Sequence, residues 1–340
     1  MVDEADVDPH AGERPMKKRL IASGALIFVI SVILASGTAW ADYKQAVALY
    51  NRGQYDKAIQ ELKADLDANP DWESGQRLLG LCYLNLKNNA LAISALTRAV
   101  QLKSTTAATY IGLGQAHFNM QKYDECLQAL NQGEPFLANL KQGAEAQSYQ
   151  FYQLRGSANL RLQKSAEAVE DFTKALRTGR SDWTDFLQLG NAYYNLGRLD
   201  DAIQALQKAS SMKPGQTGVA DLIGKTYFKM GLHELSAKQY AQALASFQKS
   251  KEIDSQNGYI DYNMAEAYLF QKNYKEAEKS LNQAAVLLPR SAEVQQRLGL
   301  VLEKQKKWDP ALTAYKKADA ISPSKAVKEA ISRVQEAKKQ

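Results

Sequence analysis

The feature that most constrains this chain is a repeat of 34 residues. A residue with a small side chain recurs at the eighth position of each unit, a second follows at the twentieth, and a large apolar residue stands four positions later. The eighth positions are Ala46, Gly80, Gly114, Gly156, Gly190, Gly231, Ala265 and Gly299, and the large residues are Leu62, Leu96, Leu130, Phe172, Leu206, Phe247, Leu281 and Tyr315. Two helices that cross closely need a residue without bulk at their contact. The period therefore predicts helical hairpins that stack, because no single hairpin buries its own apolar face.

Composition favours the same fold. Apolar residues make up 45% of the chain, only 8 prolines are present, and alanine, leucine, lysine and glutamine dominate. These residues form helices readily, whereas valine and isoleucine are sparse outside residues 20–41. We therefore expect helices and no sheet.

Residues 183–216 show the unit most clearly, and they identify a family. The first half holds Phe186, Leu189, Gly190 and Tyr193, and the second holds Ala202, Leu206, Ala209 and Pro214. This pattern resembles the tetratricopeptide repeat, a helix–turn–helix unit. The resemblance implies an all-α fold, a right-handed α-solenoid of about eight repeats. They are placed near 39–72, 73–106, 107–140, 149–182, 183–216, 224–257, 258–291 and 292–325.

Two insertions and a terminal segment refine this organisation. Extra residues near 140–148 precede the fourth repeat, and seven more precede Gly231. Gly224 also fits the small position, so we expect the first helix of the sixth repeat to be lengthened. Residues 326–340 are amphipathic and are predicted to close the array as a capping helix.

The N-terminal segment predicts export. Lys17, Lys18 and Arg19 precede residues 20–41, which carry no charge and end in Ala39-Trp40-Ala41 before Asp42. A basic stretch, an apolar stretch and an A-x-A site form a signal-peptide pattern over residues 1–41. Because residues 1–15 are polar and acidic, Met16 is a candidate initiator.

Cleavage after Ala41 would release a periplasmic or secreted protein. The alternative is an uncleaved leader, since residues 20–41 are long enough to span a bilayer. That alternative gives an inner-membrane anchor with the repeats facing the periplasm, because basic residues stay in the cytoplasm.

No catalytic, metal or nucleotide motif stands out. The chain has 3 histidines, none in a metal-binding pattern, and no phosphate loop or nucleophile elbow. We therefore expect neither an enzyme nor a cofactor, and the absence of a basic run predicts no binding of nucleic acid. Cys82 and Cys126 are interpreted as small packed residues, although an oxidising compartment would permit a disulfide.

The resemblance implies a concave groove lined by the first helix of each repeat. Residues at the groove positions predict a peptide-binding site comprising Tyr50, Asn51, Arg77, Asn85, Gln115, Phe118, Asn119, Asn191, Tyr194 and Asn195. Asparagine recurs there, and its amide can pair with the backbone of an extended peptide. Two alternatives remain: the asparagines serve the turn that follows, and the aromatic residues belong partly to the core.

These patterns indicate a binding protein. The leading hypothesis is an exported scaffold or adaptor that holds a protein or peptide in its groove, with a role in cell-envelope assembly. The alternatives are a self-associating structural module that forms homo-oligomers, and a membrane-anchored form of the same protein. Tyr43 and Val47 stand where a clamp for acidic C-terminal tails would need lysine and asparagine, which argues against that ligand.

Overall fold

The computed structural model describes residues 43–139 and 145–339, and every regular element in those ranges is a helix. Residues 43–51 are helical. In the first half there follow α2 (Tyr55–Ala68), α3 (Glu73–Asn85), α4 (Asn89–Gln101), α5 (Ala107–Asn119), α6 (Tyr123–Gly133), the 3-10 helix η2 (Glu134–Asn139), α7 (Glu145–Arg161) and α8 (Ser165–Arg177). In the second half there follow α9 (Trp183–Asn195), α10 (Leu199–Met212), α11 (Thr217–Ser236), α12 (Tyr240–Ile253), α13 (Gly258–Phe270), α14 (Tyr274–Leu287), α15 (Ala292–Lys304), α16 (Trp308–Ile321) and α17 (Lys325–Lys339). The predicted all-α repeat fold is confirmed.

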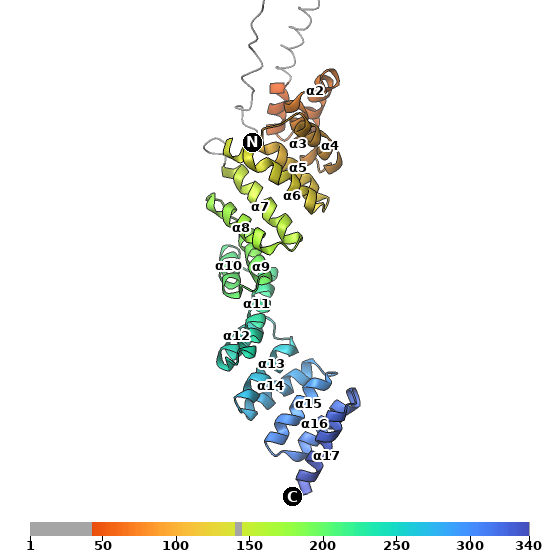
Figure 1. Cartoon of the computed structure of the whole chain (residues 1–340), viewed down its shortest axis with the longest axis vertical. Coiled ribbons are helices and arrows are strands. Elements are labelled where there is room, and N and C mark those ends of the chain that lie inside the picture. Colours follow the sequence, from red (N-terminus) through yellow and green to blue (C-terminus); the bar gives the residue numbers. More distant parts are fainter. Residues whose placement is uncertain (1–42, 140–144, 340) are drawn as a thin grey trace, which may run out of the picture. The chain divides into compact units, whose positions relative to one another are not determined.

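The helices form two compact units, unit 1 ending at Arg180 and unit 2 beginning at Ser181. Within each unit, consecutive α-helices from α2 to α8 and from α9 to α17 pack on one another, as the ribbons of Figure 1 show. The first helices of neighbouring repeats also touch, α3 with α5 and α5 with α7. Side chains from several first helices can therefore meet on one face of unit 1.

Six of the hairpins are closed by the close contact to a glycine that the period predicts. A Cβ atom added at Gly190 would lie 2.6 Å from Cγ of Leu206, and one added at Gly231 would lie 2.5 Å from Cε1 of Phe247. Gly80, Gly114, Gly156 and Gly299 meet Leu96, Leu130, Phe172 and Tyr315 in the same way. The large residue of the second helix thus fills the space that glycine leaves on the first.

The turn inside each hairpin has a left-handed residue at its fifteenth position. These residues are Gly53, Lys87, Gln121, Gln163, Gly197, Lys238, Lys272 and Lys306, with φ between 59° and 74°. In one such turn the N–H of Lys87 donates to the carbonyl of Leu84 at 2.9 Å, which satisfies an orphan carbonyl of α3. Glycine adopts this conformation without strain because it lacks a Cβ atom. Lysine and glutamine have one, so they adopt the conformation at a cost in free energy.

Prolines follow four of the helices, and the second insertion lengthens a helix as the sequence predicts. The helices α2, α10, α14 and α16 each end two residues before a proline, respectively Pro70, Pro214, Pro289 and Pro323. The helix α11 runs for 20 residues and contains both Gly224 and Gly231, so the second insertion lengthens a helix. After the first insertion, α7 begins at Glu145 and runs for 17 residues.

The last helix covers the end of unit 2. The side of α17 that carries Val327, Ala330 and Val334 is buried, and α17 packs on α16. Arg333 of α17 forms an ion pair with Glu303 of α15, at 2.7 Å between Nε and Oε1. The predicted export leader, residues 1–41, lies outside the described residues. In the described ranges, none of the helices combines the length and apolar character that a membrane crossing needs.

Candidate peptide-binding groove

Unit 1 contains a groove with a cavity volume of about 480 Å³. Its lining includes five of the residues that the repeat pattern predicts, namely Tyr50, Arg77, Asn85, Gln115 and Asn119. The remaining lining residues are Leu81, Leu84, Lys87, Ala108, Ile111, Gly112, Gln147 and Gln150. The groove thus brings together side chains from four successive repeats.

Helical spacing explains why these side chains share one face. On α3, Arg77, Leu81 and Asn85 lie four residues apart, and on α5, Ile111, Gln115 and Asn119 do the same. The two helices touch, so the two stripes lie side by side. Each stripe therefore combines one apolar side chain, Leu81 or Ile111, with polar ones, and every stripe ends in an asparagine amide.

Hydrogen bonds within the protein orient the amides. Nδ2 of Asn85 donates to Oη of Tyr50 at 3.1 Å and to the carbonyl of Leu81 at 2.9 Å. Nε2 of Gln115 donates to Oδ1 of Asn119 at 2.8 Å, and Nδ2 of Asn119 donates to Oδ1 of Asn89 at 3.0 Å. Asn85 and Asn119 are exposed at the ends of their helices. The side chains are therefore held in place while their remaining polar groups face the solvent.

Tyr50 forms the end of the groove nearest the N-terminus. Its ring meets Tyr55 edge-on, with centroids 5.4 Å apart, and the residue is half-buried. Burial raises the pKa of the Tyr50 hydroxyl, although the hydrogen bond from Asn85 opposes that shift. Tyr50 is thus a neutral hydroxyl at physiological pH and belongs partly to the core.

The charged side chains of the described groove lining are cations, Arg77 and Lys87. Arg77 is 1% exposed and pairs with Glu73, at 3.6 Å between Nε and Oε1. Lys87 is exposed in the left-handed turn position. Arg77 is therefore a buried wall of the groove, while Lys87 stands at its rim.

The other predicted residues lie elsewhere. Phe118 is half-buried and packs edge-on against Tyr123, at 5.3 Å between centroids, so its ring supports the hairpin. Asn51 is exposed at the end of the first helix and is absent from the groove lining.

Three predicted residues belong to unit 2, on α9. Asn191 is half-buried and Asn195 is exposed. Tyr194 borders a separate cavity of about 560 Å³, which Phe228 and Leu232 also line. Lys229 donates to the carbonyl of Tyr194 at 3.0 Å and lies 4.5 Å from the centre of its ring. Tyr194 therefore belongs to a different cavity, and none of these three residues lines the groove of unit 1.

Sequence reasoning missed the groove wall formed by α7. Gln147 and Gln150 line the groove near the first insertion, where the repeat numbering is interrupted. Gln147 lies in the insertion and had no assigned repeat position, whereas Gln150 is the second residue of the repeat placed at 149–182 and was not selected as a candidate. Their glutamine amides extend the amide character of α3 and α5.

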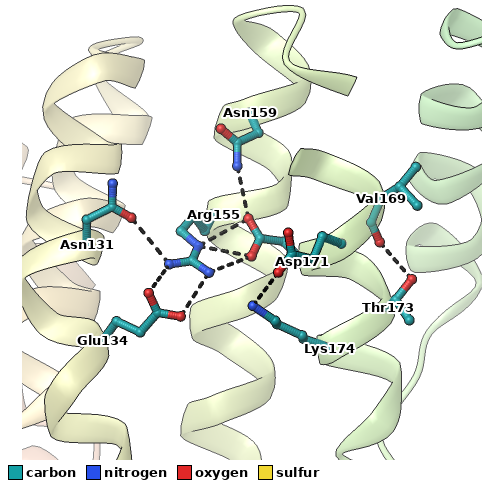
Figure 2. Close-up of polar contacts among 9 residues, drawn as sticks. Asn131, Glu134, Arg155, Asn159, Val169, Asp171, Thr173 and Lys174 are labelled. Carbon is teal, nitrogen blue, oxygen red and sulfur yellow. Dashed lines mark hydrogen bonds and ion pairs between the residues drawn. The ribbon is translucent and has the colours of Figure 1, made fainter. Parts of the chain in front are cut away.

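A buried arginine fixes α7 to its neighbours (Figure 2). Arg155 is 8% exposed. Its Nη2 donates to Oδ1 of Asp171 on α8 at 2.8 Å, and its Nη1 donates to Oε2 of Glu134 on η2 at 2.7 Å. Asn131 accepts from Nη1 at 3.3 Å, and Asn159 donates to Oδ2 of Asp171 at 2.9 Å. The guanidinium thus ties three consecutive helical elements together.

The same cluster has opposing effects on its two carboxyl groups. The hydrogen bonds from Arg155 lower the pKa of Glu134, because they favour its charged form. Burial raises the pKa of Asp171, although Arg155 and Asn159 oppose that shift. The repeat pattern does not mark Arg155. The one sequence feature that indicates it is a charged side chain directly before the small position Gly156.

The described residues contain no cluster of three or more histidine, cysteine or acidic side chains that could hold a metal ion. Cys82 and Cys126 are free thiols, each 0% exposed and in separate apolar clusters. Burial raises the pKa of each thiol to about 12, so both are protonated at neutral pH.

Comparison with known proteins identifies the class. Family models of the tetratricopeptide repeat match residues 43–107, 138–217 and 234–296, which together exceed half of the chain. The chain belongs to the tetratricopeptide repeat family. Proteins of this family generally bind other proteins and assemble complexes.

Individual relatives are distant. The chain is 23% identical over 277 residues to "Tetratricopeptide repeat protein 1" of Schizosaccharomyces pombe, covering 80% of this chain and 23% of that protein. It is 22% identical over 250 residues to "Anaphase-promoting complex subunit 3" of the same yeast, covering 74% of this chain and 30% of that protein. The chain thus spans less than a third of the length of these two relatives.

A solved structure shares the fold. The structure of Naa15/Naa10 bound to HypK-THB matches with a TM-score of 0.56 and 14% identity, covering 86% of this chain and 43% of that chain. This likeness concerns the helical repeat architecture alone.

Proposed function

We propose that this chain is a protein-binding scaffold and that the groove of unit 1 holds an extended segment of a partner protein. The observation that carries the proposal is the gathering of Tyr50, Asn85, Gln115 and Asn119 around one cavity. These residues come from three repeats, and Leu81, Leu84 and Ile111 add apolar side chains to the lining of the same cavity. An extended peptide needs donors and acceptors for its backbone and apolar area for its side chains.

The internal hydrogen bonds define which groups would meet that peptide. Asn85 uses both N–H groups within the protein, so Oδ1 is the group it offers to a partner N–H. Tyr50 accepts from Asn85, so its O–H can donate to a partner carbonyl. Asn119 accepts from Gln115 and donates once to Asn89, which leaves its second N–H. Acceptor and donor groups thus alternate along the groove.

Matched asparagine variants test the proposal. Asn85, Asn119 and Asn195 occupy the same repeat position, but Asn195 does not line the groove of unit 1. A partner would be captured by cross-linking in the native cell and identified by mass spectrometry. Overlapping synthetic peptides of that partner would then be titrated against the purified chain by fluorescence anisotropy.

We expect Asn85→Ala with Asn119→Ala to weaken the binding peptide about 30-fold, since two hydrogen bonds contribute about 1 kcal/mol each. Asn195→Ala should leave the affinity unchanged. Equal affinity of the double variant and the wild type would remove the groove from the function.

We further propose that the chain is exported, with a role in cell-envelope assembly. The support is the basic, apolar and A-x-A sequence that ends at Ala41. The mass of the mature protein tests it, because cleavage predicts an N-terminus at Asp42. A mature chain that retains residues 20–41 and resists carbonate extraction from membranes would instead establish the anchored form. A protein found only in the cytoplasm would overturn both.

The name of one relative supports the broader role. Anaphase-promoting complex subunit 3 is by name part of a multiprotein complex. We extend to this chain only the general role of assembling proteins.

A further inference from the structure

Three consecutive hairpin turns of unit 2 each present a lysine in the left-handed conformation. Lys238, Lys272 and Lys306 have φ of 62°, 59° and 60°, and all three are exposed. None of them takes part in an ion pair among the described residues. Glycine would relieve the strain at this position, as in Gly197 of the preceding hairpin. Each of these turns therefore carries a lysine without an ion-pair partner in the described part of the chain, in a left-handed backbone conformation that is unfavourable for lysine.

An aromatic pair with one exposed ring lies between the first two lysines. Tyr240 opens α12 two residues after Lys238, and Phe270 closes α13 two residues before Lys272. Their rings stack, with centroids 5.3 Å apart and an interplanar angle of 10°. Phe270 is nevertheless 57% exposed, a large apolar surface for one side chain.

Contacts between the turns make this one continuous surface. The Tyr240–Phe270 stack joins the first turn to the second. Nε2 of Gln305 donates to the carbonyl of Tyr274 at 3.2 Å, which joins the third turn to the second. The lysines hold the same position in consecutive repeats, so they recur along one edge of the stacked hairpins. We name the three turns, residues 236–242, 270–276 and 304–310, the lysine edge.

The lysine edge has an excess of positive charge that the opposite edge lacks. Its residues are rich in lysine and include only two carboxylates, Glu276 and Asp309. The turns at the other end of the same repeats, residues 254–260 and 288–294, carry one base, Arg290, against Asp254 and Glu293. Among these turns, the excess of positive charge therefore lies on the side that exposes Phe270.

We propose that the lysine edge is a docking surface for an anionic phospholipid membrane. Lysines near such a surface are attracted by the lipid phosphates, each by about 1 kcal/mol. An exposed phenylalanine beside them can enter the boundary between headgroups and acyl chains. An acidic protein segment would satisfy the lysines but would leave Phe270 without an apolar contact. This surface belongs to unit 2 and does not depend on the proposed groove of unit 1.

A local fluorescent probe tests the proposal in the full-length chain. Gln271 is exposed between Phe270 and Lys272, so Gln271→Cys places one accessible thiol on the edge. Cys82 and Cys126 are fully buried and should not take an environment-sensitive label. Vesicles of phosphatidylcholine, alone or with about one third phosphatidylglycerol, would carry a headgroup spin label that quenches the probe. Because the probe reports contact at the turn itself, insertion of residues 20–41 alone would not produce the signal.

Two triple variants distinguish binding through the lysine edge from binding through the net charge of the chain. In the labelled chain, Lys238→Gln, Lys272→Gln and Lys306→Gln together remove the three turn lysines. Glutamine is compatible with the backbone, since Gln121 and Gln163 hold the same position with φ of 59° and 60°. The control changes three exposed lysines on the second helices to glutamine, namely Lys279, Lys316 and Lys317. Circular dichroism would verify that both variants remain folded.

We expect quenching with phosphatidylglycerol and none with phosphatidylcholine alone. The variant without the three turn lysines should bind the phosphatidylglycerol vesicles about 100-fold more weakly than the labelled parent chain. The control variant should bind them as tightly as the parent chain. Absence of quenching, or equal losses in both variants, would overturn the proposal. A probe response to soluble polyglutamate without quenching by vesicles would replace the lipid by an acidic polypeptide and also overturn it.

Discussion

Removing the Arg155 guanidinium gives a quantitative test of how unit 1 is held together. Arg155→Met keeps a long unbranched side chain but leaves the Asp171 carboxylate without its cation. The Asp171 side chain is 4% exposed and would retain one hydrogen bond between side chains, from Asn159 at 2.9 Å. A buried charge that loses its partner costs about 3–5 kcal/mol of stability.

Substitution of Asp171, alone and together with Arg155→Met, completes a double-mutant cycle. Asp171→Leu leaves the guanidinium paired with Glu134 alone and should cost about 3 kcal/mol. The double variant removes both buried charges, and the Glu134 side chain, which is 40% exposed, can turn to water. We therefore expect a total cost of at most about 2 kcal/mol and a coupling energy of at least about 3 kcal/mol.

Native-state hydrogen exchange with mass spectrometry would measure these energies locally. A loss of about 4 kcal/mol corresponds to roughly 1000-fold faster exchange of the α7 and α8 amides. Amides of α13 and α14, in unit 2, serve as the internal reference. If the costs of the single variants add in the double variant, the charges do not act as a pair and the reasoning fails.

Further predictions concern packing, backbone strain and pH. Gly190→Ala should lower stability by about 1–3 kcal/mol, because its Cβ would lie 2.6 Å from Leu206 Cγ. The control Gly218→Ala, whose Cβ would have no atom within 4 Å, should be neutral or stabilising, and thermal unfolding measures both variants. Lys238→Gly should raise stability by up to about 1 kcal/mol, since φ is 62°, and an unchanged or lower urea midpoint would contradict this. The hydrogen bond from Arg333 lowers the pKa of Glu303 from its ordinary value of 4.5, so the docking of α17 should be strongest above that pH and weaken as the pH falls below it. Because the Arg333 side chain is 56% exposed, the ion pair should contribute about 1 kcal/mol to the docking of α17. Hydrogen exchange of the α17 amides, corrected for the intrinsic rate, measures this, and the pH dependence should be lost in Glu303→Gln.

The groove shows where prediction from sequence succeeds and where it stops. Asn85, Gln115 and Asn119 could be found because they hold fixed positions in an uninterrupted repeat frame, and the structure brings them to one cavity. Phe118 holds the same repeat position as Tyr50 and Leu84, which line the groove, but its ring packs on Tyr123, because burying apolar surface is favoured over exposing it. The repeat position determines the helix face, while the neighbouring side chains determine the rotamer.

The Arg155 cluster was beyond sequence reasoning for a different reason. Its partners come from 16 and 21 residues away, on either side of the first insertion. The period relates only residues that are 34 apart, so a contact across the insertion has no signature. Interactions that are specific to one repeat therefore need the tertiary structure.

The sequence by itself determined the helical hairpin, its close Gly–Leu contact, the ends set by proline and the lengthened α11. All of these follow from steric rules that act within a single repeat unit and are copied along the chain. Only the tertiary structure decided which amides meet in the groove, that Arg77 is buried, and that the lysines of three turns form one exposed edge. Those outcomes depend on how neighbouring repeats pack, because the burial and pairing of a side chain are set by the residues stacked against it.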